Sequence, residues 1–251
     1  MGRSCGHPSQ PPFSHAPSIP LGWFFVHRIE WFGQTLELLP QRALYWFDRR
    51  TLIITDPHFG KGATFRSRGI PVPSGSTNSD LIRLSTLLSF FQPEELLILG
   101  DFFHTAESQS EEVLEALYFW RQQFARLRIT LIPGNHDKHA GHPPEYLDVR
   151  IVQEPYWMDP FHFCHHPICV PQDSKHYIMA DHVHPAIKLR DPSGTELKAS
   201  CFCFGPDVAL LPAFGSFTGT CTIIPSPQDR VFLIGPSEVM EIPARLVSLG
   251  R

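Results

Sequence analysis

Residues 51–58 read TLIITDPH, and this stretch decides the fold. Its first five residues are apolar or β-branched, which is typical of a strand buried on both faces of a parallel sheet. The run stops at Asp56, Pro57 and His58, which place a carboxylate and an imidazole just beyond the strand. Ligands of open α/β sheets bind beyond the carboxyl ends of the strands, so the stretch predicts both a sheet and a site.

Two segments further along the chain repeat this arrangement. LLIL at 96–99 precedes the sequence GDFFH at 100–104, and ITLIP at 129–133 precedes GNHD at 134–137. Between these strands, the spacing of apolar residues predicts helices over 79–91 and 108–127. Strands that alternate with helices indicate a largely parallel sheet with helices outside it.

Short β runs lie on both sides of this region. Residues 23–40 predict two strands around a turn at Gly33 and Gln34, and residues 60–78 predict a loop. After residue 150, strands are expected at 161–165, 176–180, 196–204, 219–225 and 230–234. Residues 1–20 are rich in Pro, Ser, His and Gly and predict a disordered tail, which leaves 21–251 as a single domain.

Composition and missing motifs exclude several classes of protein. The chain is 42% hydrophobic and 18% charged, as in globular domains, and its formal charge of −4 argues against a uniformly basic nucleic-acid coat. The sequence contains neither a C-x-x-C pair nor an apolar run of about 18 residues, so we expect a cytoplasmic protein with free thiols. P-loop enzymes and serine hydrolases are excluded because G-x-x-x-x-G-K-[ST] and G-x-S-x-G are missing.

The polar groups at the predicted strand ends have the chemistry of a metal site. FHFC at 161–164 is followed by His165 and His166, and YIMA at 177–180 by Asp181-His182-Val183-His184. Carboxylate, imidazole and amide ligands together suit Mn, Fe or Zn better than Mg alone. D-x-H and H-x-H each point two ligands at one ion, and Asp101 can bridge two ions about 3.5–4 Å apart, the recurrent arrangement for phosphoester hydrolysis.

In this order, D-x-H, G-D-x-x-H, G-N-H-D, H and H-x-H resemble the motifs of calcineurin-like metallophosphoesterases, and G-D-x-x-H is similar to the SbcD-like nuclease branch. FGKGATFRSRGIPVPSG at 59–75 and LPAFGSFTG at 211–219 resemble PdeM-type, ligase-associated DNA damage response endonucleases. The resemblance covers about residues 23–245 and implies an α/β fold, a two-sheet sandwich flanked by helices. It also implies association with a DNA ligase, helicase and exonuclease system.

The resemblance implies a role for each motif residue. One metal ion is held by Asp56, His58, Asp101 and His184, and a second by Asp101, Asn135, His165 and His182. His136 is the catalytic histidine, oriented by Asp137, and His104 matches the second histidine of the nuclease branch. The cofactors are two divalent ions, Mn²⁺ first, with Fe²⁺, Zn²⁺ and Mg²⁺ as alternatives. Lys61, Arg66 and Arg68 are candidates to hold substrate phosphates, the alternative being a solvated basic loop.

One departure from the family concerns Asp181, which stands where the last motif usually has a glycine. That glycine is wanted either for close approach of the backbone or for a positive φ, and aspartate adds a negative group near the metals. The predicted function is hydrolysis of phosphodiester bonds by a two-metal-activated hydroxide, in a DNA endonuclease or exonuclease of DNA repair. The alternative is a phosphodiesterase for small cyclic or nucleotide diesters. An all-helical HD-domain phosphohydrolase and a non-enzymatic module with a degenerate site are disfavoured.

Overall fold

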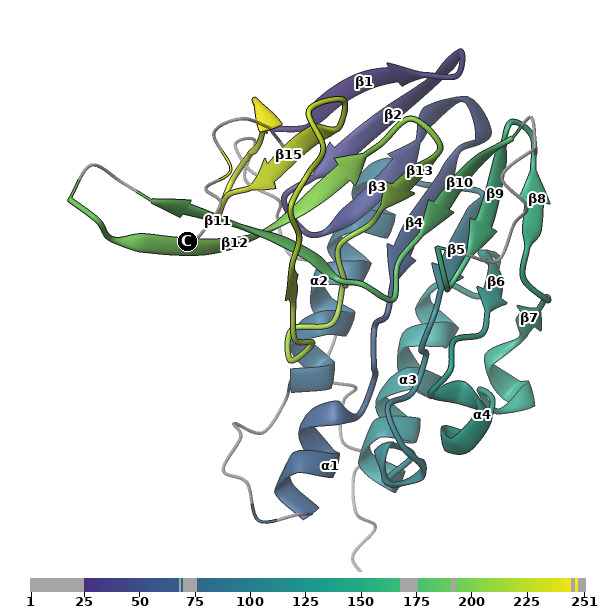
Figure 1. Cartoon of the computed structure of the whole chain (residues 1–251). Coiled ribbons are helices and arrows are strands. Elements are labelled where there is room, and N and C mark those ends of the chain that lie inside the picture. Colours follow the sequence, from purple (N-terminus) through teal and green to yellow (C-terminus); the bar gives the residue numbers. More distant parts are fainter. Residues whose placement is uncertain are drawn as a thin grey trace, which may run out of the picture.

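The structure is a computed structural model that describes residues 25–67, 69, 76–167, 176–190, 193–244 and 247. Two β-sheets pack against each other, and helices lie along the outer face of one of them (Figure 1). This is the predicted two-sheet α/β sandwich. The predicted tail at 1–20 lies outside the described residues, so the division into tail and single domain stays a prediction.

The first sheet follows the order of the chain from one edge to the other. Its strands are β1 (His27–Trp31), β2 (Gln34–Leu39), β3 (Ala43–Trp46), β4 (Thr51–Thr55), β5 (Glu95–Leu99), β6 (Arg128–Ile132) and β7 (Val149–Ile151). The first four pair antiparallel, whereas β4 to β7 run parallel. Because parallel strands end at the same edge, the polar residues after β4, β5 and β6 meet there.

Helices cover the outer face of this sheet. The described helices are α1 (Lys61–Ser67), α2 (Ser76–Phe91), α3 (Glu111–Gln123) and α4 (Asp137–Ala140), with short 3₁₀ helices η1 (Phe47–Arg49), η2 (Ala106–Ser108) and η3 (Glu145–Leu147). Leu84 of α2 and Leu117 of α3 are fully buried against Ile54 and Ile98 of the sheet. The helix α1 corrects the prediction of a loop at 60–78, because glycines and a basic run obscured one short helical segment.

The second sheet contains the strands of the C-terminal half. Its strands are β8 (Tyr156–Met158), β9 (Phe161–Cys164), β10 (Tyr177–Ala180), β11 (Pro185–Arg190), β12 (Glu196–Phe204), β13 (Val208–Leu210), β14 (Cys221–Thr222), β15 (Arg230–Ile234) and β16 (Val239–Ile242). The strands β9, β10 and β13 are parallel, and the long hairpin of β11 and β12 projects from the body (Figure 1). Of the strand predicted at 219–225, only Cys221–Thr222 pairs.

An aromatic core holds the two sheets together. Trp46 of the first sheet packs on Phe161 of the second at a ring-centroid distance of 4.9 Å, and Phe204 and Phe232 lie in the same fully buried cluster. Each such side chain contributes about 1.5–3 kcal/mol by leaving water. This core fixes how the two sheets face each other, and so it places the ends of β9 and β10 beside the ends of β4, β5 and β6.

The structure also bears on the predictions about the cysteines and about membrane spans. Cys201, Cys203 and Cys221 are free thiols, as expected, but Cys164 is disulfide-bonded, which corrects the expectation for that residue. Within the described part of the chain, every helix is too short or too polar to cross a membrane.

Candidate metal centre

The D-x-H and H-x-H turns share a left-handed backbone. Asp56, His58, His182 and His184 have φ values of 41°, 45°, 39° and 49°. Residues other than glycine rarely adopt such angles, and the strain is typical of functional sites. Asp181 itself is not among the residues with positive φ. A need for positive φ therefore does not explain the usual glycine at that position, because here the left-handed turns begin one residue later.

The first cluster of ligands joins the two turns. Nε2 of His184 lies 2.6 Å from Oδ2 of Asp56, and the ligand atoms of Asp56, His58 and His184 all lie within 4.8 Å of one another. Nδ1 of His184 donates to the carbonyl of Gly219 at 3.0 Å. That bond fixes the ring so that Nε2 faces Asp56. The structure therefore brings together three of the four predicted ligands of the first ion.

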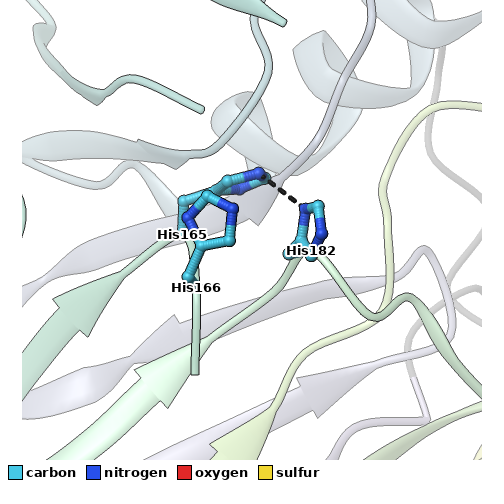
Figure 2. Close-up of side chains that lie close together, drawn as sticks. All are labelled: His165, His166 and His182. Carbon is cyan, nitrogen blue, oxygen red and sulfur yellow. Dashed lines mark hydrogen bonds between the residues drawn. The ribbon is translucent and has the colours of Figure 1, made fainter. Parts of the chain in front are cut away.

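The second cluster is formed by Asn135, His165 and His182. Nε2 of His165 lies 2.8 Å from Oδ1 of Asn135. The same nitrogen lies 3.0 Å from Nδ1 of His182 (Figure 2). Two ring nitrogens and an amide oxygen thus converge on one point. The sequence places these residues after three different strands, β6, β9 and β10, and only the packing of the two sheets brings them together.

Asp101 lies between the two clusters. Its Oδ2 is 3.8 Å from Nε2 of His58, and its carboxylate also groups with Asp56 and His165. The backbone N–H of His136 donates to its Oδ1 at 2.8 Å, which fixes the orientation of the carboxylate. A Cβ on Gly134 would collide with that carboxylate, so glycine is required in G-N-H-D for close approach. This is the position that the sequence predicts for a bridging ligand.

The electrostatics of these groups fit a divalent cation. Burial lowers the pKa of His58 to about 2 and that of His165 to about 4, so both rings are neutral, which is the form that binds metals. Burial, together with the charge of nearby Asp56, raises the pKa of Asp101 to about 6. Burial also opposes ionisation of Asp56, but the hydrogen bond from His184 and the neighbouring imidazoles lower its pKa overall. A cation would neutralise these crowded carboxylates.

The neighbouring histidines His165 and His166 have different surroundings. His165 is fully buried and contacts Asn135 and His182, whereas Nδ1 of His166 lies 3.5 Å from a carboxylate oxygen of Glu154. The ring of His166 nevertheless lies 4.5 Å from that of His182, and Figure 2 shows all three imidazoles together. His165 is the more buried of the two and also groups with Asp56 and Asp101, and its role as the ligand stays a prediction.

Asp181 contacts the far side of His165. Its Oδ1 lies 3.0 Å from Nδ1 of His165, and both side chains are fully buried. Its other oxygen makes no hydrogen bond within the described part of the chain, and burial raises its pKa well above the usual value. A carboxylate on the outer nitrogen of a ligating histidine fixes the ring and strengthens its metal bond. The sequence analysis described Asp181 only as a departure from the family's glycine. Its position directly before the H-x-H motif was the one sequence feature that could have indicated a contact with a metal ligand.

Gly100 makes room for this arrangement. It has a φ of 87°, and a Cβ there would collide with Asp181, Asp56 and His165. Glycine is therefore needed both for the backbone conformation and for the space between these three side chains.

His136 and His104 stack beside the first cluster. Their ring centroids are 4.6 Å apart, and Nδ1 of His136 donates to the backbone carbonyl of His104 at 2.9 Å. Nε2 of His136 lies 3.9 Å from Oδ2 of Asp101, and its side chain is 37% exposed. His136 is thus held at the edge of the centre, with Nε2 facing Asp101 and part of the ring exposed to solvent.

Asp137 does not make the contact predicted for it. It accepts hydrogen bonds from the backbone N–H groups of Phe102 at 3.0 Å, Phe103 at 3.4 Å and Gly134 at 2.9 Å. The partner of the His136 ring is instead the carbonyl of His104. Asp137 therefore joins the loops after β5 and β6, and its orienting role for His136 is corrected to a role in loop structure.

Of the three predicted phosphate-binding residues, the structure brings one to the centre. Lys61 is half-buried at the start of α1 and lines a small pocket with His58. Burial lowers its pKa, against the opposing charges of Asp56 and Asp101. Arg66 lies 3.8 Å from Glu112 of α3. Arg68 lies outside the described residues.

Comparisons with known proteins agree with this centre. The sequence model of the calcineurin-like phosphoesterase family matches residues 49–199, which include every predicted metal ligand. The chain is similar to the crystal structure of the Pseudomonas putida nuclease MPE, with a TM-score of 0.74 and 37% sequence identity, over 86% of this chain and 100% of that chain. The search of curated proteins found no match.

Proposed function

Because this chain belongs to the calcineurin-like phosphoesterase family, and is thus a hydrolase acting on phosphoester bonds, we propose that it is a metal-dependent nuclease that cuts DNA. The observation that carries the proposal is the position of Asp101 between two ligand clusters at the edge of the first sheet. The 37% identity to a protein described as a nuclease supports the choice of substrate.

The residues of the centre divide into ligands and groups that meet the substrate. Divalent ions held by these ligands would lower the pKa of bound water and neutralise charge on the phosphoryl oxygens. Nε2 of His136 is placed to donate a hydrogen bond or proton to the leaving oxygen, since its Nδ1 is already bound to His104. The ammonium group of Lys61 adds positive charge beside Asp56 and Asp101, where a phosphate would lie.

The finer parts of the proposal rest on donor chemistry and on sequence resemblance. Nitrogen-rich ligand sets with carboxylates suit Mn²⁺, Fe²⁺ or Zn²⁺, and we propose two ions with Mn²⁺ as the activating one. The resemblance to PdeM-type endonucleases supports a cytoplasmic role in DNA repair beside a ligase, a helicase and an exonuclease.

A phosphodiesterase for small cyclic or nucleotide diesters is the second candidate. It is favoured by the formal charge of −4 and by the ion pair that draws Arg66 toward Glu112 rather than toward the centre. The nuclease and the small-diester phosphodiesterase would use the same hydrolytic chemistry. They differ in whether the protein binds phosphates beyond the one that is cleaved.

One assay separates the two. Purified protein is stripped by chelation, reloaded with Mn²⁺, and offered single-stranded DNA, duplex DNA, a small chromogenic diester and a small monoester. Metal-dependent cleavage of DNA, abolished in Asp101→Asn, supports the nuclease. Hydrolysis of the small diester with no cleavage of either DNA supports the second candidate, and activity that survives both chelation and Asp101→Asn contradicts both.

A further inference from the structure

A large groove of about 970 Å³ lies beside the metal centre, outside the residues considered so far. Its walls come from the turn between β2 and β3, from the exposed side of α2, from β12, and from the turn between β15 and β16. Figure 1 shows α2 below the base of the β11–β12 hairpin, which is where these elements approach one another. The groove therefore joins parts of the chain that are far apart in sequence.

The charge of this groove has one sign. Arg42, Arg83 and Lys198 line it, and the described lining residues include no aspartate or glutamate. Arg83 is partly neutralised by Asp80 behind the wall, at 2.9 Å. The charge of Arg42 also acts on Asp80, whose pKa it lowers. Lys198 is exposed. A chain with a formal charge of −4 thus concentrates positive charge here.

The groove is connected directly to the metal centre. Its lining residue Thr220 accepts a hydrogen bond from Nζ of Lys198 at 2.7 Å, and the preceding residue, Gly219, accepts from Nδ1 of His184 at 3.0 Å. At the other end of the same loop, Arg83 donates to the carbonyl of Phe214, and the next residue, Gly215, donates to the carbonyl of Asp56 at 3.3 Å. One loop, residues 214–220, separates the groove from two metal ligands.

We propose that this groove holds the phosphates of a DNA strand that continues from the scissile phosphodiester, an inference that rests on the proposed nuclease function. A strand of B-DNA carries a negative charge about every 3.4 Å, so a strand cut at the metal centre places further phosphates over the neighbouring loop. The basic side chains come from three separate elements, which suits a row of phosphates better than one compact anion. Ile82 and Ile234 add apolar surface for sugars and bases.

The test removes two of the positive charges and keeps the shape. Arg42→Gln with Lys198→Gln retains long polar side chains, and the amide at 198 can still donate to the carbonyl of Thr220. Arg83 stays unchanged because it contacts Asp80 and Phe214. The quantities measured, on the Mn²⁺-loaded enzyme, are KM for a single-stranded DNA of about 20 nucleotides and its dependence on salt.

A matched control removes two arginines from the opposite edge of the first sheet. Arg128 and Arg150 line a pocket of about 440 Å³ at the amino ends of the strands, together with Glu95, Glu145 and Asp148. Arg128→Gln with Arg150→Gln changes the net charge equally without touching the groove. Thermal unfolding of both double variants checks that each is folded.

For the groove variant we expect KM for DNA to rise at least about tenfold, and the slope of log KM against log salt to fall by about 1.5, since each lost phosphate contact removes about 0.7–0.9. The ratio of DNA cleavage to small-diester hydrolysis should fall with it, and the control variant should behave as the wild type. If wild-type enzyme cuts DNA and the groove variant keeps the same KM and slope, or if the control changes equally, the groove inference is overturned alone. If wild-type enzyme hydrolyses only the small diester, the proposed nuclease function fails as well.

Discussion

Asp181, which stands where the family motif usually has a glycine, contacts a predicted metal ligand. Its carboxylate holds Nδ1 of His165 at 3.0 Å, so Nε2 of that ring faces Asn135 and His182. A glycine at this position would leave the buried ring without that partner. The aspartate therefore contacts a predicted metal ligand as well as occupying a turn.

The first prediction concerns this contact. Asp181→Gly should lower metal affinity about 10- to 100-fold, the usual effect of losing the outer partner of a ligating histidine. Asp181→Asn keeps an oxygen that can accept from His165 and should lose much less. Calorimetric titration of the metal-free proteins with Mn²⁺ measures both. Unchanged affinity in Asp181→Gly would show that the carboxylate only occupies the turn.

The second prediction separates ligands from the catalytic histidine. His136→Ala should retain its metal yet lose at least about 10²-fold in turnover, the effect of removing one acid–base or electrostatic group. His184→Ala should lose metal, because Nε2 of this ring faces Asp56 at 2.6 Å. Elemental analysis beside turnover with the small diester tests both. A metal-free His136→Ala would show that His136 is itself a ligand.

At the scale of elements, the centre depends on how each strand of the first sheet ends. β5 ends at Leu99, and the next residue, Gly100, has a φ of 87° and leaves space for Asp56, Asp181 and His165. α1 begins three residues after His58 and carries Lys61 into the centre in its first turn. Short turns with demanding geometry, rather than the strands themselves, thus position the reactive groups.

The third prediction tests the turn after β5. Gly100→Ala should lower the free energy of unfolding by clearly more than about 1 kcal/mol, because it adds a collision with buried side chains to the strain of a positive φ. Gly33→Ala is the matched control, since Gly33 also has a positive φ, of 71°, but its Cβ would meet nothing within 4 Å. Denaturant unfolding should show the larger loss for Gly100→Ala. Equal losses would mean that space around Gly100 does not matter.

The fourth prediction compares two basic residues of α1. Lys61→Gln should lower kcat/KM for the small diester about tenfold or more, because a cation beside the carboxylates of the centre is lost. Arg66→Gln should change it less than about twofold, since Arg66 is drawn toward the exposed Glu112. Steady-state kinetics on both variants decide the point. A larger effect of Arg66→Gln would indicate that Arg66 contacts the substrate.

At the scale of the whole molecule, the metal centre bridges the two sheets. Asp56, Asp101 and Asn135 follow strands of the first sheet, whereas His165 and His182 follow strands of the second. An ion bound by these residues would therefore connect the two halves of the sandwich, in addition to the aromatic core around Trp46 and Phe161.

The fifth prediction follows from this bridge. Binding to the folded state alone stabilises a protein by about 2.7 kcal/mol when the ligand is present at 100 times its Kd, so Mn²⁺ should raise the thermal midpoint in a concentration-dependent way. Chelation should reverse the shift, and His182→Ala should reduce it because one ligand of the second sheet is lost. Differential scanning calorimetry measures the midpoints. An identical midpoint with and without Mn²⁺ would show that no ion joins the sheets.

The sequence by itself determined the strands that carry the site and the order of their ligands. Apolar runs such as TLIIT and ITLIP predict buried strands. The polar residues that follow these runs are expected at the carboxyl edge of a parallel sheet. The family could also be inferred from the sequence, because its metal ligands lie in short motifs that can be recognised without knowing how the sheets pack. Strands β3, β7, β8, β13 and β16 were missed because three or four residues carry too little periodicity, and the six-residue strand β11 was missed as well.

Only the tertiary structure decided which neighbours these groups have. The contact of His165 with Asn135, the carboxylate of Asp181 behind His165, and the binding of Asp137 to backbone N–H groups rather than to His136 all depend on contacts between separate strands and loops. The groove of Arg42, Arg83 and Lys198 is another case, because its three cations are isolated in the sequence. The pattern of apolar and polar residues within a segment indicates its secondary structure. Which side chains from distant segments come into contact is set by the packing of the two sheets.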